Sequence, residues 1–400
     1  MSGWWRSIVM LLAAPGICCC KDNVPMVESG IDESYRVYRM QLLRLRSELT
    51  GEACRWTSVS PDGKERVLSA SRDCMFVSDC EGVFHLKFEI LDSDAPFRQD
   101  FQVIVVEEEI EYSPYLSRVY EYRPAPGQFI NKMPVWKAGD RETDMIAKAE
   151  ASIAGTADEL VSLGGFGGYI TFGFDHTVVN VEGEKDFMIL GNAFYEEGFE
   201  ELKAGSCEPG IVMVALDANG NGLPDDPWYE LAGSEYSSAL TLHDYSITYR
   251  RPDSSKPAVP QGPYILDAEY IPWHDSLGES GYIARNFQHT QDYFPKWLDA
   301  DELAFTGSRL ADNALDVYGN GRYFQLNSYP WGYVDNHPNY NADLCSFDIG
   351  WAVDSYGMPV HLPGVDFIRV YTALNQYCNW IGETSTEISR AQDLHLLREY

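Results

Sequence analysis

Almost the whole chain consists of short runs of β-branched and aromatic residues, separated by Gly, Pro, Asn and Asp. Residues 83–90, for example, alternate roughly between apolar and polar side chains, as a half-buried strand requires. Only residues 140–154 have the composition of a helix, with acidic residues near the start and apolar Met145, Ile146 and Ile153. No internal repeat with a fixed period is present, which disfavours propellers and solenoids. The pattern therefore predicts an all-β fold with one short helix.

The acidic stretch at 107–111, followed by Tyr112-Ser113-Pro114, divides the chain into two predicted domains. Residues 24–109 contain strand-like runs bounded by turn signals, which is typical of an immunoglobulin-like sandwich. The runs are 35–43, 55–59, 66–70, 82–90 and 101–106. Residues 112–400 are predicted to form a larger, elaborated jelly-roll β-sandwich with long loops.

The charge balance excludes one class of function. The chain has 30 Lys and Arg against 61 Asp and Glu, a formal net charge of −31. Such a chain repels phosphate backbones, so nucleic-acid binding is excluded, while divalent cations and neutral or cationic ligands stay open. No apolar run reaches the roughly 18–20 residues of a membrane-spanning helix.

Residues 1–20 are predicted to be a lipoprotein signal peptide and anchor. Arg6 precedes a short apolar run, 7–17, which stops at three consecutive cysteines. Cys20 is the predicted acylated residue, with Cys18 as the alternative, and an uncleaved hydrophobic start is the other interpretation. The following Lys21-Asp22 resembles the acidic tag that sends Bacteroidetes lipoproteins to the outer face of the outer membrane.

The remaining cysteines leave the disulfide pairing open. An exported chain permits disulfides, but three cysteines in each half leave at least one per half without a partner in its own half. Buried free thiols are the alternative. These residues are Cys54, Cys74, Cys80, Cys207, Cys345 and Cys378.

The loop at 217–226 (DANGNGLPDD) has the spacing of a calcium site. Oxygen-bearing side chains occupy positions 1, 3, 5 and 9, and Gly222 at position 6 permits a sharp turn. Position 12 is Trp228 rather than a bidentate Glu, and the flanks are strand-like, so this is not an EF-hand. An Asx-rich hairpin without metal is the alternative. The predicted ligands are Asp217, Asn219, Asn221, Leu223, Asp225 and Asp226.

Other polar motifs give weaker signals for chemistry. Residues 335–343 are rich in oxygen ligands without regular spacing, which favours ordinary loop polarity. The glycine-rich 164–168 leads into a strand and not a helix, so it is interpreted as a close-packed bend. His176 and His337 are expected to be structural hydrogen-bonding residues. The sequence has no GxSxG or HExxH motif. Carboxylates near strand ends are expected by chance in so acidic a chain; they are Asp175, Glu208, Asp348 and Glu383.

Three segments carry a resemblance to a family of Bacteroidetes cell-surface lipoproteins. They are LGGFGGYITFGFDH with DFMILGNAF, EPGIVMVALDANGNGLPDDPWYELAGSEY, and VDFIRVYTALNQYCNWIGETSTEISRAQDLHL, and the resemblance spans about 115–398. It implies a jelly-roll domain with the topology of a sugar-binding module, carried on a PKD-like (Ig-like) spacer. It also implies a gene neighbourhood with outer-membrane nutrient receptors, including those that import corrinoids.

Aromatic residues give an independent indication of ligand binding, because a ring can stack on a sugar or a flat macrocycle. Trp331, Tyr333 and Trp380 are the predicted ligand contacts, since polar loop residues surround them. The alternative is that these rings belong to the core of a large sandwich.

Together these patterns predict a lipid-anchored outer-membrane protein that captures a ligand without transforming it. The ligand is expected to be a glycan, a corrinoid or another small molecule, and the resemblance implies a TonB-dependent receptor of the outer membrane as the partner. A glycoside hydrolase or lyase with a carboxylate pair, and a purely structural or adhesive protein, are the alternatives.

Overall fold

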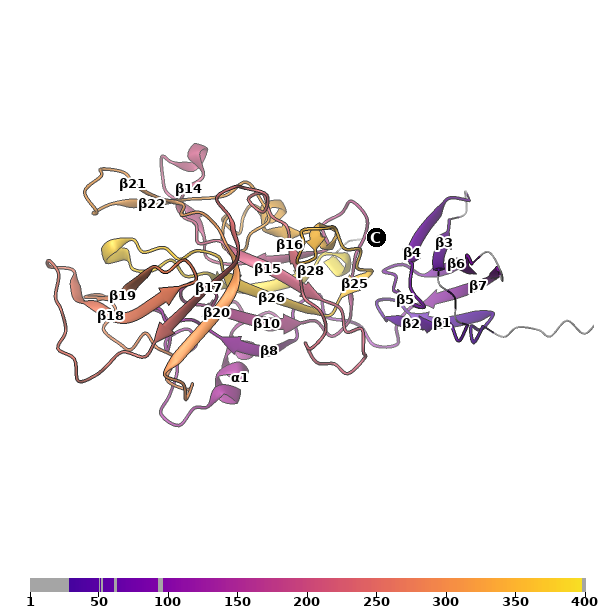
Figure 1. Ribbon diagram of the computed structural model, residues 1–400, viewed down its shortest axis with the longest axis horizontal. Helices are drawn as coiled ribbons and strands as arrows, with labels where there is room; N and C mark the ends of the chain where they lie inside the picture. The colour runs from indigo at the N-terminus through magenta and orange to yellow at the C-terminus, as the bar shows by residue number, and fades with distance from the viewer. Residues whose placement is uncertain (1–28, 50, 52, 61–62, 93–95, 398–400) are drawn as a thin grey trace, which may run out of the picture.

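The computed structural model describes residues 29–397 except 50, 52, 61–62 and 93–95. The predicted acylation at Cys20 lies outside the described residues. The predicted all-β class is confirmed, because strands dominate both parts of the described chain (Figure 1). Its one α-helix, α1 (Glu142–Ile153), lies within the predicted 140–154.

The N-terminal part contains two small sheets around one core. The five-stranded sheet has the order β1-β7-β6-β3-β4, and β2 pairs with β5. The bounds are β1 Ser34–Tyr38, β2 Leu43–Arg46, β3 Cys54–Val59, β4 Glu65–Ser69, β5 Asp73–Phe76, β6 Gly82–Ile90 and β7 Phe97–Val106. Trp56 is fully buried in this core, with its ring 4.5 Å from that of Phe88.

One predicted strand, 35–43, is in fact two. The chain leaves β1 at Tyr38 and turns at Met40, whose φ is 56° and whose N–H donates to the carbonyl of Ser78. β2 then begins at Leu43 in a different sheet. Alternation alone did not reveal this turn, because no Gly or Pro marks it.

The larger part is built around a six-stranded sheet of order β24-β16-β15-β26-β10-β8. A four-stranded sheet of order β19-β18-β17-β20 packs beside it. The bounds in the first sheet are β8 Arg118–Arg123, β10 Tyr169–Gly173, β15 Gly210–Ala215, β16 Tyr229–Leu231, β24 Ala352–Val353 and β26 Phe367–Thr372. Those in the second are β17 Leu242–Arg250, β18 Ile265–Asp275, β19 Ser280–Asn286 and β20 Glu302–Arg309.

Smaller sheets and single turns of 3₁₀ helix complete this part. The sheets have the orders β13-β14-β22-β21, β23-β12-β28, β11-β25 and β27-β9. The strand bounds are β9 Val161–Ser162, β11 Val178–Val179, β12 Phe187–Leu190, β13 Phe194–Tyr195, β14 Ala204–Ser206, β21 Ala314–Asp316, β22 Phe324–Asn327, β23 Ser346–Phe347, β25 Gly364–Val365, β27 Glu387–Ile388 and β28 Arg390–Asp393. The 3₁₀ turns are η1 Glu200–Leu202, η2 Ala342–Cys345, η3 Ile349–Trp351, η4 Asn379–Ile381 and η5 His395–Leu397.

Alternation explains the two faces of the six-stranded sheet. On β15, Val212 and Val214 are buried, while Met213 between them points to the other face and is half-buried. Glu230 on β16 and Arg369 on β26 pair with Met213 and therefore lie on that same face. The sheet thus has one apolar face in the core and one face with polar side chains.

The glycine-rich segment 164–168 is the close-packed bend that the sequence predicts. A Cβ on Gly168 would overlap the carbonyl oxygen of Leu163 and the amide nitrogen of Ala125. Phe166, in the middle of the segment, is fully buried.

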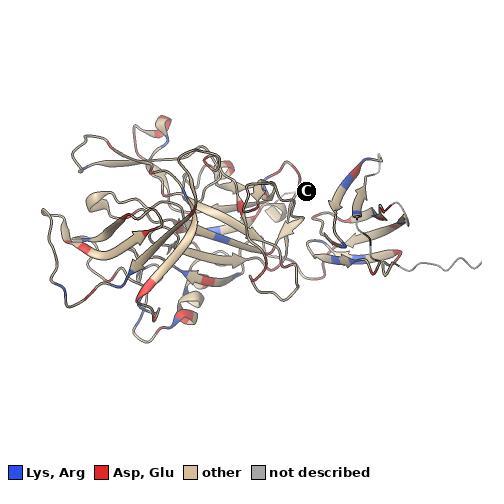
Figure 2. Cartoon of the chain, viewed as in Figure 1, with Lys and Arg blue, Asp and Glu red and all other residues tan. Residues whose placement is uncertain are grey.

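The N-terminal part contacts the larger part through a small apolar cluster that includes Met40, Val77 and Val179. In Figure 1, β1–β7 lie at one end of the molecule and β18 and β19 at the opposite end. Acidic positions are spread over both parts (Figure 2). Within the described ranges, no helix is long and apolar enough to span a bilayer.

Five cysteines, Cys54, Cys74, Cys207, Cys345 and Cys378, are buried free thiols.

Candidate functional site

The three predicted ligand-contacting rings lie in different surroundings. Tyr333 is only 2% exposed, and its hydroxyl accepts a hydrogen bond of 2.9 Å from the backbone N–H of Glu235. Trp331 is 38% exposed, and its ring packs 4.6 Å from that of Trp351. Trp380 is partly buried and donates from its indole nitrogen to a backbone carbonyl. Among the described rings, no contact joins these three residues to one another.

Hydrogen bonds within the loop hold the predicted calcium ligands. The Asp217 carboxylate accepts hydrogen bonds from the backbone N–H groups of Gly220, Asn221 and Gly222. The side-chain amides of Asn219 and Asn221 donate to the Asp225 carboxylate at 2.9–3.1 Å.

The neighbours of this loop differ along its length. Leu223 is exposed, and one carboxylate oxygen of Asp226 is enclosed without a hydrogen-bond partner. Arg44 of the N-terminal part forms an ion pair with Asp217. The loop therefore also contributes to the contact between the two parts.

A pocket of about 480 Å³ opens on the polar face of the six-stranded sheet, and we call it the sheet-face pocket. Met213 and Glu230 line it from the sheet, and Val353 and Tyr371 lie beside them. Strands β17 and β20 of the four-stranded sheet and the loop at 354–357 form its walls. Its volume is in the range of about 300–1,000 Å³ that is typical of small-ligand sites.

A β-bulge directs two polar residues into this pocket. The register between β17 and β20 shifts between Leu242 and Tyr245, and Asp244 has a φ of 56°. Bulges redirect side chains and are common at binding sites. Both residues of this bulge, His243 and Asp244, line the pocket.

Three side chains of the pocket form a hydrogen-bonded chain. Ser308 Oγ lies 2.6 Å from Glu230 Oε2 and 3.0 Å from His243 Nδ1. The other imidazole nitrogen, Nε2, lies 3.1 Å from a backbone carbonyl oxygen and must therefore carry a proton. When Ser308 donates to His243, Glu230 must be a neutral acid that donates to Ser308. When Glu230 is ionised, Ser308 donates to its carboxylate instead.

Burial raises the pKa of Glu230 to about 7, and the hydrogen bond from Ser308 opposes this rise. The chain of three residues therefore changes its charge distribution close to neutral pH. Perturbed carboxyl groups in a concave site are characteristic of functional sites.

Aromatic rings complete the sheet-face pocket. Trp228 stacks on the guanidinium of Arg369 at 4.2 Å, and the ring of Tyr236 lies 4.6 Å from that of His243. Tyr356 is 88% exposed and offers an uncovered ring at the rim. The ring of Tyr371 packs directly against Gly307, another lining residue; a Cβ at Gly307 would lie only 2.9 Å from that ring. The pocket thus combines one exposed ring and several partly or fully buried ones with hydrogen-bond acceptors and donors.

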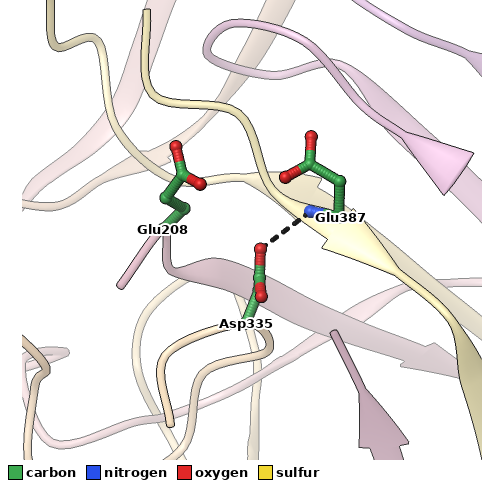
Figure 3. Close-up of side chains that lie close together, drawn as sticks. All are labelled: Glu208, Asp335 and Glu387. Carbon is green, nitrogen blue, oxygen red and sulfur yellow. Dashed lines mark hydrogen bonds between the residues drawn. The ribbon is translucent and has the colours of Figure 1, made fainter. Parts of the chain in front are cut away.

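A second polar group is buried inside the larger part. The side chains of Glu208, Asp335 and Glu387 point toward one another, with ligand atoms within 4.8 Å (Figure 3). Asp335 accepts hydrogen bonds from the backbone N–H groups of Asn192, Ala193 and Glu387. Ser385 donates from its hydroxyl to Glu387 and from its backbone N–H to Glu208.

The three carboxyl groups strongly affect one another's ionisation. Burial, the neighbouring charge of Glu387 and that of Asp335 hold the pKa of Glu208 well above its usual range. Burial and the charge of Asp335 raise the pKa of Glu387 to about 8. Burial raises the pKa of Asp335 to about 7, although its backbone hydrogen bonds favour the charged form. The group therefore retains protons near neutral pH. Its hydrogen bonds also connect the surrounding backbone segments.

The arrangement of three carboxylates could hold a cation, but the grouping alone does not identify one. The sequence flagged Glu208 only as one of several carboxylates near strand ends, and it favoured ordinary loop polarity for 335–343. That last expectation was wrong for its first residues, since Asp335, Asn336 and His337 are all buried.

The two histidines singled out in the sequence have hydrogen-bonding partners. His176 lies 2.7 Å from both Asp175 and Asp393, and its side chain is fully buried. Burial disfavours its charged form, but the two carboxylates outweigh this effect and raise its pKa. His337 Nδ1 lies 2.6 Å from the hydroxyl of Tyr195.

Comparison with known proteins gives little further information. No protein-family model matches the chain, and no curated protein matches it. Among solved structures, it is similar to one described as SusE-like protein BT2857, at 9% identity and a TM-score of 0.30. The match covers 88% of this chain and 96% of that one. So low a structural similarity supports no conclusion about fold or function.

Proposed function

We propose that this protein captures a glycan in the sheet-face pocket and releases it chemically unchanged. The observation that carries the proposal is the combination of an exposed ring, Tyr356, with a hydrogen-bonded set of polar side chains in one concave site. A sugar ring presents apolar C–H faces, which pack on aromatic rings, and hydroxyls, which need donors and acceptors. Glu230, Ser308 and His243 provide such donors and acceptors.

The proposal also includes the location of the protein and its partner, and the predicted N-terminal signal supports the location. We propose that Cys20 is acylated, that the chain is displayed on the outer membrane, and that it passes its ligand to a TonB-dependent receptor. A corrinoid is the alternative ligand, and a broader, flatter concavity would suit it better than this pocket does. A purely structural role is less well supported, because it would leave the concave sheet-face pocket without a function.

A binding screen of the purified protein against glycans and cobalamin tests the proposal. Tyr356→Ala should weaken glycan binding about three- to tenfold, because an aromatic contact contributes about 0.5–1.5 kcal/mol beyond its buried area. Tyr340 is 74% exposed and lies outside the pocket, so Tyr340→Ala is the matched control and should leave affinity unchanged. Binding of cobalamin alone, or equal effects of both substitutions, would refute glycan capture at this pocket.

A glycoside hydrolase or lyase is the second candidate, and one observation favours it. With a pKa of about 7, Glu230 retains a proton at neutral pH, as a general acid does, and Asp244 and Asp354 line the same pocket. Incubation of the protein with each glycan that it binds distinguishes the two functions. Released reducing ends that disappear in Glu230→Gln would establish catalysis and overturn the proposal of simple capture.

We also propose that loop 217–226 binds calcium through the predicted ligands. The contacts of Asn219 and Asn221 with Asp225 and the enclosed, unpartnered oxygen of Asp226 support this. Bound at a hundredfold excess over its dissociation constant, calcium would stabilise the fold by about 2.7 kcal/mol. A chelator should therefore lower the melting temperature, and the double variant Asn219→Ala/Asp225→Ala should abolish that response. An unchanged melting temperature on chelation would remove calcium from the proposal.

A further inference from the structure

Another cavity lies on the four-stranded sheet, at the end of the molecule opposite to β1–β7 (Figure 1). Its volume is about 650 Å³, and strands β17, β18 and β19 and the segments that follow β17 and β19 line it. Tyr282 lines it with a partly exposed ring, and Pro272 lies beside it. We call it the basic cavity, for the reason given next.

The charges in this cavity reverse the balance of the whole chain. Five basic residues line it against four acidic ones, whereas the chain has 30 basic against 61 acidic residues. The basic residues are Arg250, Arg251, Lys256, Arg285 and Lys296. The acidic residues are Asp253, Asp267, Glu269 and Asp292. Basic residues are thus much more frequent among the lining residues than in the chain as a whole, although Glu302 and Asp301, just outside the lining, pair with two of them.

Four of the five cations already have a carboxylate partner within the protein. The ion pairs are Arg250–Glu302, Arg251–Asp301, Lys256–Glu269 and Lys296–Asp292. Arg285 differs from them, because its side chain forms no ion pair and no hydrogen bond with any residue in the described ranges. Its Nε is enclosed by the protein without a hydrogen-bond partner.

The neighbouring carboxylates are engaged elsewhere. Asp267 is the cross-strand neighbour of Arg285, but its carboxylate accepts hydrogen bonds from the backbone N–H groups of Val259 and Glu269. Asp292 accepts from the hydroxyl of Tyr270 and pairs with Lys296. The ring of Tyr270 in turn holds the guanidinium of Arg285, whose Cζ lies 4.6 Å from the ring centroid.

Arg285 is therefore a half-buried, oriented guanidinium without a direct carboxylate partner in the described ranges, although its charge is among those that favour the ionised form of Asp292. Partial removal of a cation from water without a counter-ion is unfavourable, and an incoming anion would relieve that cost. A planar carboxylate matches the fork of a guanidinium, with two parallel hydrogen bonds. Tyr282 and Pro272 offer apolar surface for the body that carries the carboxylate.

We propose that the basic cavity is a second ligand site, which binds the carboxylate of an acidic sugar through Arg285. This site is separate from the sheet-face pocket, so the test of this proposal is independent of the test of the function proposed for that pocket. The two sites together would let one protein bind a polymer that contains both neutral and acidic sugars.

Equilibrium binding of galacturonate and glucuronate oligosaccharides to the whole purified protein tests the proposal, with their methyl esters as neutral probes. The acids should bind at least tenfold more tightly than the esters, and their affinity should fall as salt is added. Arg285→Gln should lower the affinity for the acids about ten- to a hundredfold and leave that for the esters unchanged. Arg285→Lys, which retains the charge but not the fork, should give an intermediate loss.

Two controls distinguish this site from its alternatives. Arg36→Gln removes an equal charge from an exposed position on β1 and should have no effect. Tyr356→Ala, in the sheet-face pocket, should leave binding of the acids at the basic cavity intact. Equal affinity for acids and esters, tighter binding of sulfated than of carboxylated sugars, no binding of any acid, or unchanged binding in Arg285→Gln would each overturn the assignment.

Discussion

Replacement of Glu383 by glutamine should change how the stability of the protein depends on pH. Glu383 is 4% exposed; one of its carboxylate oxygens accepts a hydrogen bond from the backbone N–H of Gln128, and the other has no partner. Burial raises its pKa from 4.5 to about 7. At about 1.4 kcal/mol per pH unit, this rise corresponds to about 3 kcal/mol.

The sign follows from the proton balance. Between pH 4.5 and pH 7 the folded protein keeps the proton of Glu383, whereas the unfolded chain has lost it. Stability contributed by this group is therefore fully present below pH 4.5 and is lost as pH rises through 7. Glu383→Gln does not titrate, so it removes this loss. Its charge also raises the pKa of Glu208 and Glu387, so the same substitution moves their contribution in the same direction.

Urea unfolding of wild type and Glu383→Gln at pH 4.5 and pH 8 measures the effect. The substitution itself has a cost, because the new amide needs a partner, but that cost is common to both pH values. The variant should gain about 3 kcal/mol relative to wild type between pH 4.5 and pH 8. Glu201→Gln, at an exposed position on η1, is the control and should show no such gain. A gain below about 0.5 kcal/mol, or one of opposite sign, would refute the reasoning.

Three further substitutions test other parts of the structure. Ser308→Ala removes the hydrogen bond that lowers the pKa of Glu230, so a carboxyl titration followed by NMR should move upward from about 7; a downward movement would show that Ser308 accepts a hydrogen bond from the protonated Glu230 and does not donate to its carboxylate. Gly191→Ala places a Cβ against the carboxylate of Asp335 and should destabilise the larger part by about 2–4 kcal/mol in urea unfolding. An unchanged free energy of unfolding would show that the Asp335 carboxylate can move away from the new Cβ without cost. Trp56→Ala should cost about 3–5 kcal/mol and lower the unfolding transition of the N-terminal part without moving that of the larger part; a common shift of both would show that the two unfold together.

The sequence predicts those features that depend on local pattern. The run at 82–90 alternates clearly and coincides with β6, and the helix within 140–154 is found because its formers and acidic start are contiguous. β5 was missed, because Asp73–Phe76 is too short to show alternation.

The candidate sites depend on long-range pairing and so could not be predicted in the same way. Glu230 stood in a quoted motif, but its neighbours Ser308 and His243 reach it only after β16, β17 and β20 have been placed. The predicted ring contact Tyr333 is buried, because its hydroxyl finds a backbone donor inside the protein. A single sequence does not show which rings find such internal partners. For the exposed Tyr356, the usable signal was its position in a short polar loop after a strand.

The lengthwise arrangement of the molecule bears on what the basic cavity can meet. A tether at the N-terminal end would place β1–β7 next to the bilayer and hold β18 and β19 farthest from it (Figure 1). Negatively charged lipid headgroups, which would otherwise compete for the guanidinium of Arg285, would then lie at the opposite end of the molecule. The N-terminal part would act as a spacer that keeps Arg285 exposed to the surrounding medium and away from the membrane.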